Sequence, residues 1–285
     1  MQFQITNIYN DNFMTKRTFA AINGVSSHIS INNEQILFDL GLVRWRFKRN
    51  MKLLNINPNE IDKIFISHGH MDHTRGLEPL LKKRTNANKI ILFSHPSVIE
   101  PKRAFYHGIK LWNAGFPKLP SELEKKVEFR FNKDSEEIAP NLFTSGEVPL
   151  EERTEEQNLG KLYKHNVNGR WEKDPLIDEQ FLILKAKEGL VIISGCGHIG
   201  ILNTLRITEE QFNDKVIAVI GGIHLIFAKK EKVFRMADKL MQRYGDIKFY
   251  LNHSIGTNAF KLLVKKMGKE TIQRFSVGDK LTFDC

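Results

Sequence analysis

This 285-residue chain contains the sequence Ile64-Phe65-Ile66-Ser67-His68-Gly69-His70-Met71-Asp72-His73. A short apolar run, typical of a buried strand, stops at Ser67, and three histidines and one aspartate follow within six positions. Neutral imidazole and carboxylate are ligands that zinc, iron and manganese accept. A single histidine beside a strand is usually a packed core residue, whereas four such groups in one turn are not. The stretch therefore predicts a metal site at the end of a strand.

Three later apolar runs also end in a histidine. Strands that each deliver a histidine beyond their carboxyl ends suit a sheet with its functional groups along one edge. His198 is a ligand candidate, and His224 and His253 are expected along the same edge. Cys196 is either a thiolate ligand or a small buried residue after a strand. The runs are 190–193, followed by Ser194-Gly195-Cys196-Gly197-His198; 216–220, followed by Gly221-Gly222-Ile223-His224; and 247–251, followed by Asn252-His253-Ser254.

Other polar residues also lie next to expected strands. His95 follows the run 89–93 and is a possible site residue or a structural residue beside Pro96. Glu147 follows the run 138–143 and is a ligand, a substrate contact or a turn residue. Asp178, which precedes the run 181–184, is a further candidate, and Asp39 either hydrogen-bonds the metal-binding loop or caps a turn.

Composition describes an ordinary globular chain, with 41% hydrophobic and 27% charged residues. No apolar run approaches the roughly 20 residues that span a bilayer, so no membrane association is expected. Residues 1–10 are polar and lack the pattern of a signal peptide. Two cysteines, Cys196 and Cys285, do not form a disulfide framework, and we expect a cytoplasmic protein.

The chain is basic, with 43 Lys and Arg against 33 Asp and Glu and a net charge of +10. Most of this excess is expected on a solvated surface. The clusters 44–49 and 82–84 either bind an anion or form part of that surface. The partner expected is a small molecule, and the basic charge suggests an anionic one. Nucleic acid is not expected because the sequence offers no separate module or basic arm for it, and oligomeric state is not indicated.

Strands and helices alternate along one expected domain, 1–285. Hairpins are predicted for 26–31 with 35–39 and for 181–184 with 190–193, and a helix for 229–244. The aromatic segment near 100–121 is interpreted as a lid or pocket wall, or equally as a packed loop. The charged segment near 151–175 is interpreted as a lid or exposed insertion.

The residues 67–73 resemble the HxHxDH signature of the metallo-β-lactamase superfamily, and His198 and His253 follow in the order of its later ligands. More narrowly, the chain resembles the branch of dihydropterin (ribofuranosyl)aminobenzene phosphate synthase-like proteins from about Asn23 to its end. The matching pieces are Gly76-Leu77, His95-Pro96, Ser145-Gly146-Glu147, Asp178-Glu179-Gln180, Gly195-Cys196-Gly197-His198, Gly221-Gly222-Ile223-His224-Leu225 and Gly278. The resemblance implies an α/β fold, an αββα sandwich of two mixed sheets flanked by helices.

The resemblance also implies a dinuclear site for one or two divalent ions, with zinc expected and iron or manganese as alternatives. One metal would take His68, His70 and His198, and the second would take Asp72, His73 and His253. The aspartate that bridges the metals in the superfamily would fall near Ser194–His198, where none exists. That gap leaves four alternatives: an unusual role for Cys196, one for His198, Glu147 as a substitute, or one weakly bound metal.

Two further departures from the branch lie near the expected site, at Ile22-Asn23-Gly24 and at His253-Ser254. They leave the metal ligands unchanged but bear on the substrate.

The leading hypothesis is a metal-dependent hydrolase that uses a metal-bound hydroxide on a small anionic or phosphorylated substrate. Asp72 would orient the nucleophile. His224 would be either a proton donor or substrate contact, or a support for the ligands. The alternatives are a pterin-type transferase that forms a C–N bond, as in methanopterin synthesis, a nuclease or phosphodiesterase, and a non-catalytic metal-binding protein.

Overall fold

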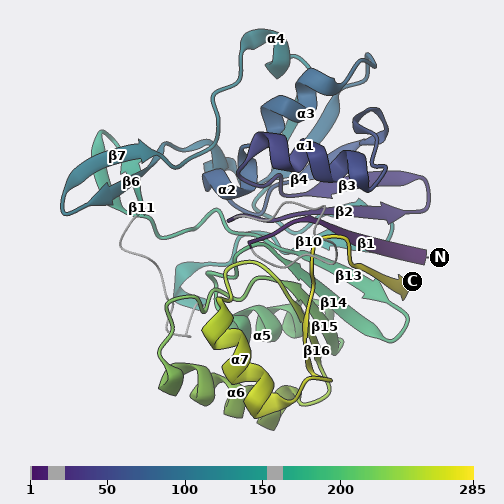
Figure 1. Ribbon diagram of the computed structural model, residues 1–285, viewed down its shortest axis with the longest axis vertical. Helices are drawn as coiled ribbons and strands as arrows, with labels where there is room; N and C mark the ends of the chain where they lie inside the picture. The colour runs from purple at the N-terminus through teal and green to yellow at the C-terminus, as the bar shows by residue number, and fades with distance from the viewer. Residues whose placement is uncertain (1, 12–22, 153–162) are drawn as a thin grey trace.

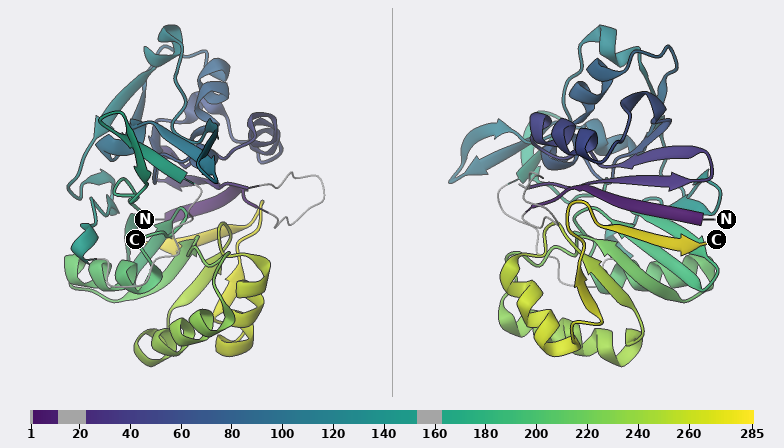
Figure 2. Two further views of the ribbon diagram at one scale, coloured as in Figure 1. Left: turned by 90° about the vertical axis from the view of Figure 1, so that its left-hand side faces the viewer. Right: turned by 45° about the vertical axis from the view of Figure 1, so that its right-hand side comes forward.

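The structure, a computed structural model, describes residues 2–11, 23–152 and 163–285. Two seven-stranded sheets lie face to face, and helices cover their outer faces (Figure 1). This arrangement confirms the αββα sandwich expected from the sequence. The two ends of the chain lie side by side (Figures 1 and 2) because the last strand pairs with the first, from Gln2 opposite Asp284 to Thr6 opposite Lys280.

The first sheet has the order β18-β1-β2-β3-β4-β5-β8. Its first four strands are antiparallel and include the predicted hairpin of β2 and β3, whereas β3, β4, β5 and β8 run parallel. The carboxyl ends of these parallel strands therefore share one edge of the sheet. The strands are β1 (Gln2–Tyr9), β2 (Ser26–Ile31), β3 (Glu34–Phe38), β4 (Lys63–Phe65), β5 (Ile90–Ser94), β8 (Val127–Phe131) and β18 (Lys280–Asp284).

The second sheet has the order β17-β16-β15-β14-β13-β10-β9 and is likewise divided into a parallel and an antiparallel half. Strands β14 to β17 run parallel, and β13 forms the predicted hairpin with β14. The segment 138–143 was predicted as one strand. It is instead a hairpin that turns at Asn141, whose φ is +62°. The strands are β9 (Glu137–Ala139), β10 (Leu142–Thr144), β13 (Leu182–Ala186), β14 (Gly189–Ser194), β15 (Val216–Gly221), β16 (Lys248–Leu251) and β17 (Ile272–Arg274).

Helices cover the outer faces of both sheets (Figures 1 and 2). Apolar residues of α1 and α3 pack on the first sheet, and those of α5, α6 and α7 pack on the second. No helix in the described ranges is long and apolar enough to cross a membrane. The helices are α1 (Arg44–Leu53), α2 (Met71–Thr74), α3 (Leu77–Lys83), α4 (Ser121–Glu124), α5 (Ile201–Phe212), α6 (Lys230–Tyr244) and α7 (Thr257–Met267), with 3₁₀ turns at Pro58–Glu60, Pro96–Ile99 and Leu150–Glu152.

A smaller four-stranded sheet, in the order β12-β11-β6-β7, lies beside the sandwich (Figure 1). It consists of β6 (Lys102–Tyr106), β7 (Ile109–Asn113), β11 (Tyr163–Val167) and β12 (Arg170–Lys173). These strands come from the two segments interpreted as a lid or insertion. The first segment is therefore a strand hairpin rather than a packed loop, and residues 153–162 of the second lie outside the described residues. The lid role stays a prediction.

The core between the two large sheets should dominate stability. Leu184 of β13 is fully buried among apolar side chains of both sheets, whereas Leu53 at the end of α1 is 44% exposed. We predict that Leu184→Ala lowers the free energy of unfolding by about 2–5 kcal/mol, because it removes buried methyl groups and leaves a cavity. The matched change Leu53→Ala should cost less than about 1 kcal/mol. Urea denaturation followed by circular dichroism measures both, and equal losses would contradict this account of the core.

Candidate metal centre

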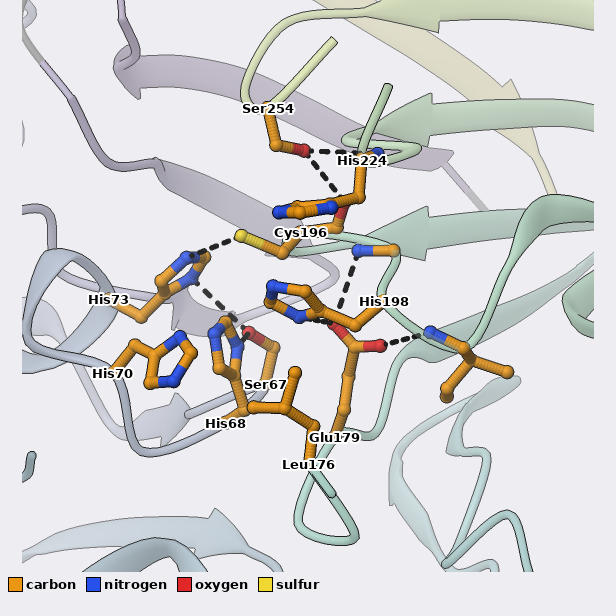
Figure 3. A network of polar contacts seen from close by, with 12 residues as sticks. Ser67, His68, His70, His73, Leu176, Glu179, Cys196, His198, His224 and Ser254 are labelled. Atoms are coloured by element: carbon orange, nitrogen blue, oxygen red, sulfur yellow. Dashed lines mark hydrogen bonds and ion pairs between the residues drawn. The ribbon is translucent and has the colours of Figure 1, made fainter. Parts of the chain in front are cut away.

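The predicted metal-binding residues meet at one edge of the sandwich. The loop after β4 supplies His68, His70, Asp72 and His73, and the segment after β14 supplies Cys196 and His198. His253 follows β16 of the second sheet. Because these strands lie in the parallel halves of the two sheets, their carboxyl ends converge. The close-up view shows the side chains of His68, His73, Cys196 and His198 pointing toward one another (Figure 3).

Potential ligand atoms form three overlapping groups, each with its atoms within 4.8 Å of one another. The first and third groups share no residue, and the second takes one histidine from each of them. The groups are His68, His70 and His198; His68, His73 and Cys196; and Asp72, His73 and His253. The arrangement therefore offers two neighbouring ligand sets with a thiol between them.

Four of the five histidines have Nδ1 occupied by an oxygen. Ser67 Oγ donates its proton to Asp39 Oδ2 at 2.7 Å, so it accepts from His68 Nδ1 at 3.1 Å. The other three Nδ1 contacts are carboxylates: Asp39 to His73 at 2.6 Å, Glu179 to His198 at 2.8 Å and Asp11 to His253 at 2.6 Å. Such contacts fix the orientation of the ring and direct the opposite nitrogen, Nε2, to the centre.

His70 approaches a carboxylate through its other nitrogen. Its Nε2 lies 3.5 Å from Asp174 Oδ2, which is ion-pair distance, and it makes no hydrogen bond within the described residues. This contact leaves Nδ1 as the ring atom available to a metal.

The residues present fit a divalent cation. His68 Nε2 is buried and has no hydrogen-bond partner among the described residues, and a buried polar atom without a partner is costly. Burial and the nearby imidazoles of His73, His70 and His198 hold the pKa of His68 well below its usual value, so the ring is neutral. A neutral imidazole nitrogen with no proton and no partner is what a zinc, iron or manganese ion requires of a histidine.

Cys196 lies between the two ligand sets. Its Sγ is 3.2 Å from His73 Nε2 and 3.1 Å from His253 Nε2 (Figure 3 shows the first contact). Burial, with the carboxylates of Asp72 and Glu179, raises the pKa of the thiol well above its usual value in the chain alone. A coordinating metal removes the proton of a thiol, so this environment is consistent with a ligand. Of the residues named as alternatives to a bridging aspartate, Cys196 and His198 lie in the ligand groups and Glu147 does not.

Charges within the second ligand set are strongly coupled. Burial raises the pKa of Asp72, but the imidazoles of His73 and His253 more than reverse this and lower it to about 2. Burial lowers the pKa of His73, but Asp39 and Asp72 raise it to about 9. In the chain alone these carboxylates therefore hold a proton on His73, which a metal ion must displace.

His224 lies over the first ligand set, with its ring centroid 4.3 Å from that of His198. Burial and the nearby His198 lower its pKa to about 2, so the ring is neutral, and its Nδ1 has no partner among the described residues.

Four non-glycine residues around the centre have positive φ values, namely Asp39 (+52°), Leu176 (+53°), His224 (+40°) and Ser254 (+60°). Backbone strain of this kind is concentrated at functional sites.

The structure does not bring His95 or Glu147 into these ligand groups. His95 Nε2 lies 2.8 Å from Glu147 Oε2, and Lys133 Nζ lies 3.0 Å from the same oxygen. Glu147 therefore has partners of its own and lies outside the ligand groups. His95 Nδ1 accepts from the amide of Ser97, which is a structural contact.

The sequence Asp178-Glu179-Gln180 connects both halves of the centre. Asp178 is also outside the ligand groups; it accepts a hydrogen bond from the Gly69 amide at 2.7 Å. Glu179 accepts from the amides of Gly197 and Ile199 and contacts His198, and the Gln180 amide donates to the Ser67 carbonyl. These buried residues contact the two histidine-bearing loops and lie outside the ligand groups.

Sequence reasoning missed four residues of the site. Asp11, Asp174 and Glu179 hold histidines that are 242, 104 and 19 positions away in the chain, and no local pattern reveals such pairs. The fourth, Tyr163, places its ring 4.6 Å from that of His70. Burial and the charges of Asp72 and Cys196 raise the pKa of its hydroxyl to about 12, so it stays protonated.

Comparisons with known proteins agree with this geometry. A family model described as anti-Pycsar protein Apyc1 matches residues 16–104. The 7,8-dihydropterin-6-methyl-4-(β-D-ribofuranosyl)-aminobenzene-5'-phosphate synthase of Methanocaldococcus jannaschii is 33% identical over 273 residues, which cover 93% of this chain and 91% of that protein.

Two solved structures show the same fold. Tm1679, a metal-dependent hydrolase of the β-lactamase superfamily, has a TM-score of 0.78 and 26% identity over 98% of both chains. The metallo-β-lactamase fold protein YhfI of Bacillus subtilis has a TM-score of 0.57 and 11% identity over 98% of this chain and 99% of its own. The chain therefore belongs to the metallo-β-lactamase superfamily and, within it, to the family of the M. jannaschii synthase.

Proposed function

We propose that this protein is a metal-dependent hydrolase that acts on a small phosphorylated or otherwise anionic molecule. The observation that carries the proposal is the pair of adjacent ligand sets, in which oxygen contacts direct the histidine ring nitrogens to a common centre. Divalent cations held there would polarise the substrate and lower the pKa of a bound water toward neutrality. The net charge of +10 favours the approach of an anionic substrate.

The chain's own residues have distinct roles in this proposal. His68, His70 and His198 hold one cation, and Asp72, His73 and His253 hold the other, with Cys196 shared. Asp72 Oδ2 lies 3.5 Å from His253 Nε2 and is one-fifth exposed, so it also faces the space that substrate would enter. His224 presents a neutral ring with an unpartnered Nδ1, which suits a hydrogen bond to the substrate.

A second candidate is a synthase that joins a pterin to a phosphorylated aminobenzene compound by a C–N bond. The name of the M. jannaschii relative favours it, and the same cation-binding edge would serve it. The two candidates differ in whether water is a reactant.

Removal of a ligand should abolish both metal binding and activity. We predict that His70→Ala lowers metal affinity by more than the roughly 10- to 100-fold that changes outside the ligand shell cost. Its turnover of phosphate esters and phosphodiesters should fall to background, as should that of chelator-treated wild type. His95→Ala is the matched control, because His95 is also buried and contacts a carboxylate but lies outside the ligand groups. Elemental analysis and a colorimetric phosphate assay measure these effects, and full activity without bound metal would contradict the proposal.

The role of Cys196 can be tested against the other cysteine of the chain. We predict that Cys196→Ser reduces metal content from two ions to one per chain, because a hydroxyl replaces the shared thiolate poorly. Cys285→Ser should leave the content unchanged, since Cys285 is far from the ligand groups in the chain and only half-buried. Mass-spectrometric metal analysis measures both, and an unchanged content in Cys196→Ser would remove Cys196 from the ligand set.

Product analysis separates the two candidate functions. A hydrolase incorporates one oxygen from ¹⁸O-labelled water into its product, because water supplies the nucleophile. We therefore expect labelled phosphate or alcohol from a phosphorylated substrate, detected by mass spectrometry. A pterin–aminobenzene adduct formed from the two separate reactants, with no hydrolysis of either, would instead establish the synthase.

A further inference from the structure

A lysine buried between two aspartates lies beside the metal-binding loop. Lys102, the first residue of β6, is only 2% exposed, and its Nζ lies 2.8 Å from Asp174 Oδ2 and 3.0 Å from Asp178 Oδ1. The two carboxylates are also buried, at 4% exposure for Asp174 and 0% for Asp178. Charged groups so far from water are costly unless they are paired, so each of the three depends on the others.

Both aspartates contact Lys102 and also contact the loop that carries His70. Asp178 Oδ2 accepts from the amide of Gly69, immediately before His70. Asp174 Oδ2, the oxygen that binds Lys102, also lies 3.5 Å from His70 Nε2. A methyl group at Gly69 would come within 3.1 Å of both Asp178 Oδ2 and Lys102 Cε, so the lysine lies directly against this turn.

The small sheet is attached to the metal-binding loop at this point. Lys102 belongs to β6, and Asp174 follows β12. Backbone hydrogen bonds also connect β6 to the metal-binding loop. The Met71 amide donates to the Ala114 carbonyl, and the Ala114 amide donates to the Lys102 carbonyl. Movement of the small sheet would therefore move the carboxylate that holds His70.

Loss of the lysine charge would disturb His70 through Asp174. Asp174 and Asp178 would become a buried pair of like charges, and Asp174 would lose the contact that fixes its oxygen near His70 Nε2. A ligand ring without a fixed partner binds its metal more weakly. His73, His198 and His253 keep their own carboxylates and would be little affected.

We propose that Lys102 is a positioning residue that orients His70 through Asp174 and so couples the small sheet to the first cation. This inference rests on the metal-dependent function proposed above and assigns a role to a residue outside the ligand groups. It makes a specific claim: loss of Lys102 weakens the set of His68, His70 and His198 and spares the set of Asp72, His73 and His253.

The test is a double-mutant cycle with Lys102→Met, Asp174→Ala and the double variant. Zn²⁺ affinity is measured by competition with a chromophoric chelator, and Co²⁺ absorption reports the coordination of each site. The binding step of each set is identified with His198→Ala and His253→Ala. We expect each single variant to lower the affinity of the first set by about 10- to 100-fold and the second set by less than about twofold. The double variant should be no worse than the weaker single variant, because both changes act on the same contact.

Lys63→Met is the control for loss of a lysine ion pair, since Lys63 is half-buried and bonds to Glu34 and the Ile138 carbonyl. It should leave both affinities unchanged. If Lys102→Met does not fold, Asp174→Ala decides alone, because it leaves Lys102 paired with Asp178. Normal affinity of the first set in the folded variants, or equal and additive losses at both sets, would overturn the inference while the proposed function stands. A wild-type chain that binds no metal would overturn both.

Discussion

The metal centre depends on the contacts that the buried carboxylate of Asp39 makes. It accepts hydrogen bonds from the amide and hydroxyl of Ser67 and contacts His73 Nδ1 at 2.6 Å, so it joins the end of β3 to the loop after β4. The second sheet reaches the same cluster through Gly195. A side-chain carbon there would lie 2.2 Å from Ser67 Oγ and 3.0 Å from Asp39 Oδ2, so this close approach of the two sheets requires glycine.

The centre is rich in negative charge, and this has a consequence for metal binding. Asp11, Asp39 and Glu179 each hold one histidine. In the chain alone, a proton on His73 balances part of this charge, because Asp39 and Asp72 raise the pKa of His73 to about 9. When cations bind, they take over that balance and the protons leave. The histidine–carboxylate contacts are thus favourable in both states, which allows the loops to be ordered before a metal arrives.

Local sequence patterns predicted the potential ligands that directly follow apolar runs. The cluster 68–73 and the histidines after β14, β15 and β16 follow apolar runs, and the parallel strands bring most of them together. The partners of those histidines could not be predicted in this way. Asp11 follows β1, a strand that the sequence analysis did not identify, and it meets His253 only because β1 lies in the first sheet. The small sheet was also missed: β6 with β7 and β11 with β12 are local hairpins, but the pairing of β6 with β11 that makes them one sheet joins residues about 60 positions apart.

The ligand sets alone do not determine which reaction occurs, because one fold supports many chemistries. Cations at this edge activate a phosphoryl group or a water in the same way whatever molecule carries it. Selectivity must come from groups that contact the rest of the substrate. Tyr163 of the small sheet lies against His70, and Phe227, which is 68% exposed, lies beside His224 on the opposite sheet. These two aromatic residues come from elements outside the metal-binding loops, and each offers a flat apolar surface beside a histidine of the centre. A substrate with a planar ring next to its anionic group would use both features, whereas an inorganic anion would use only the cations.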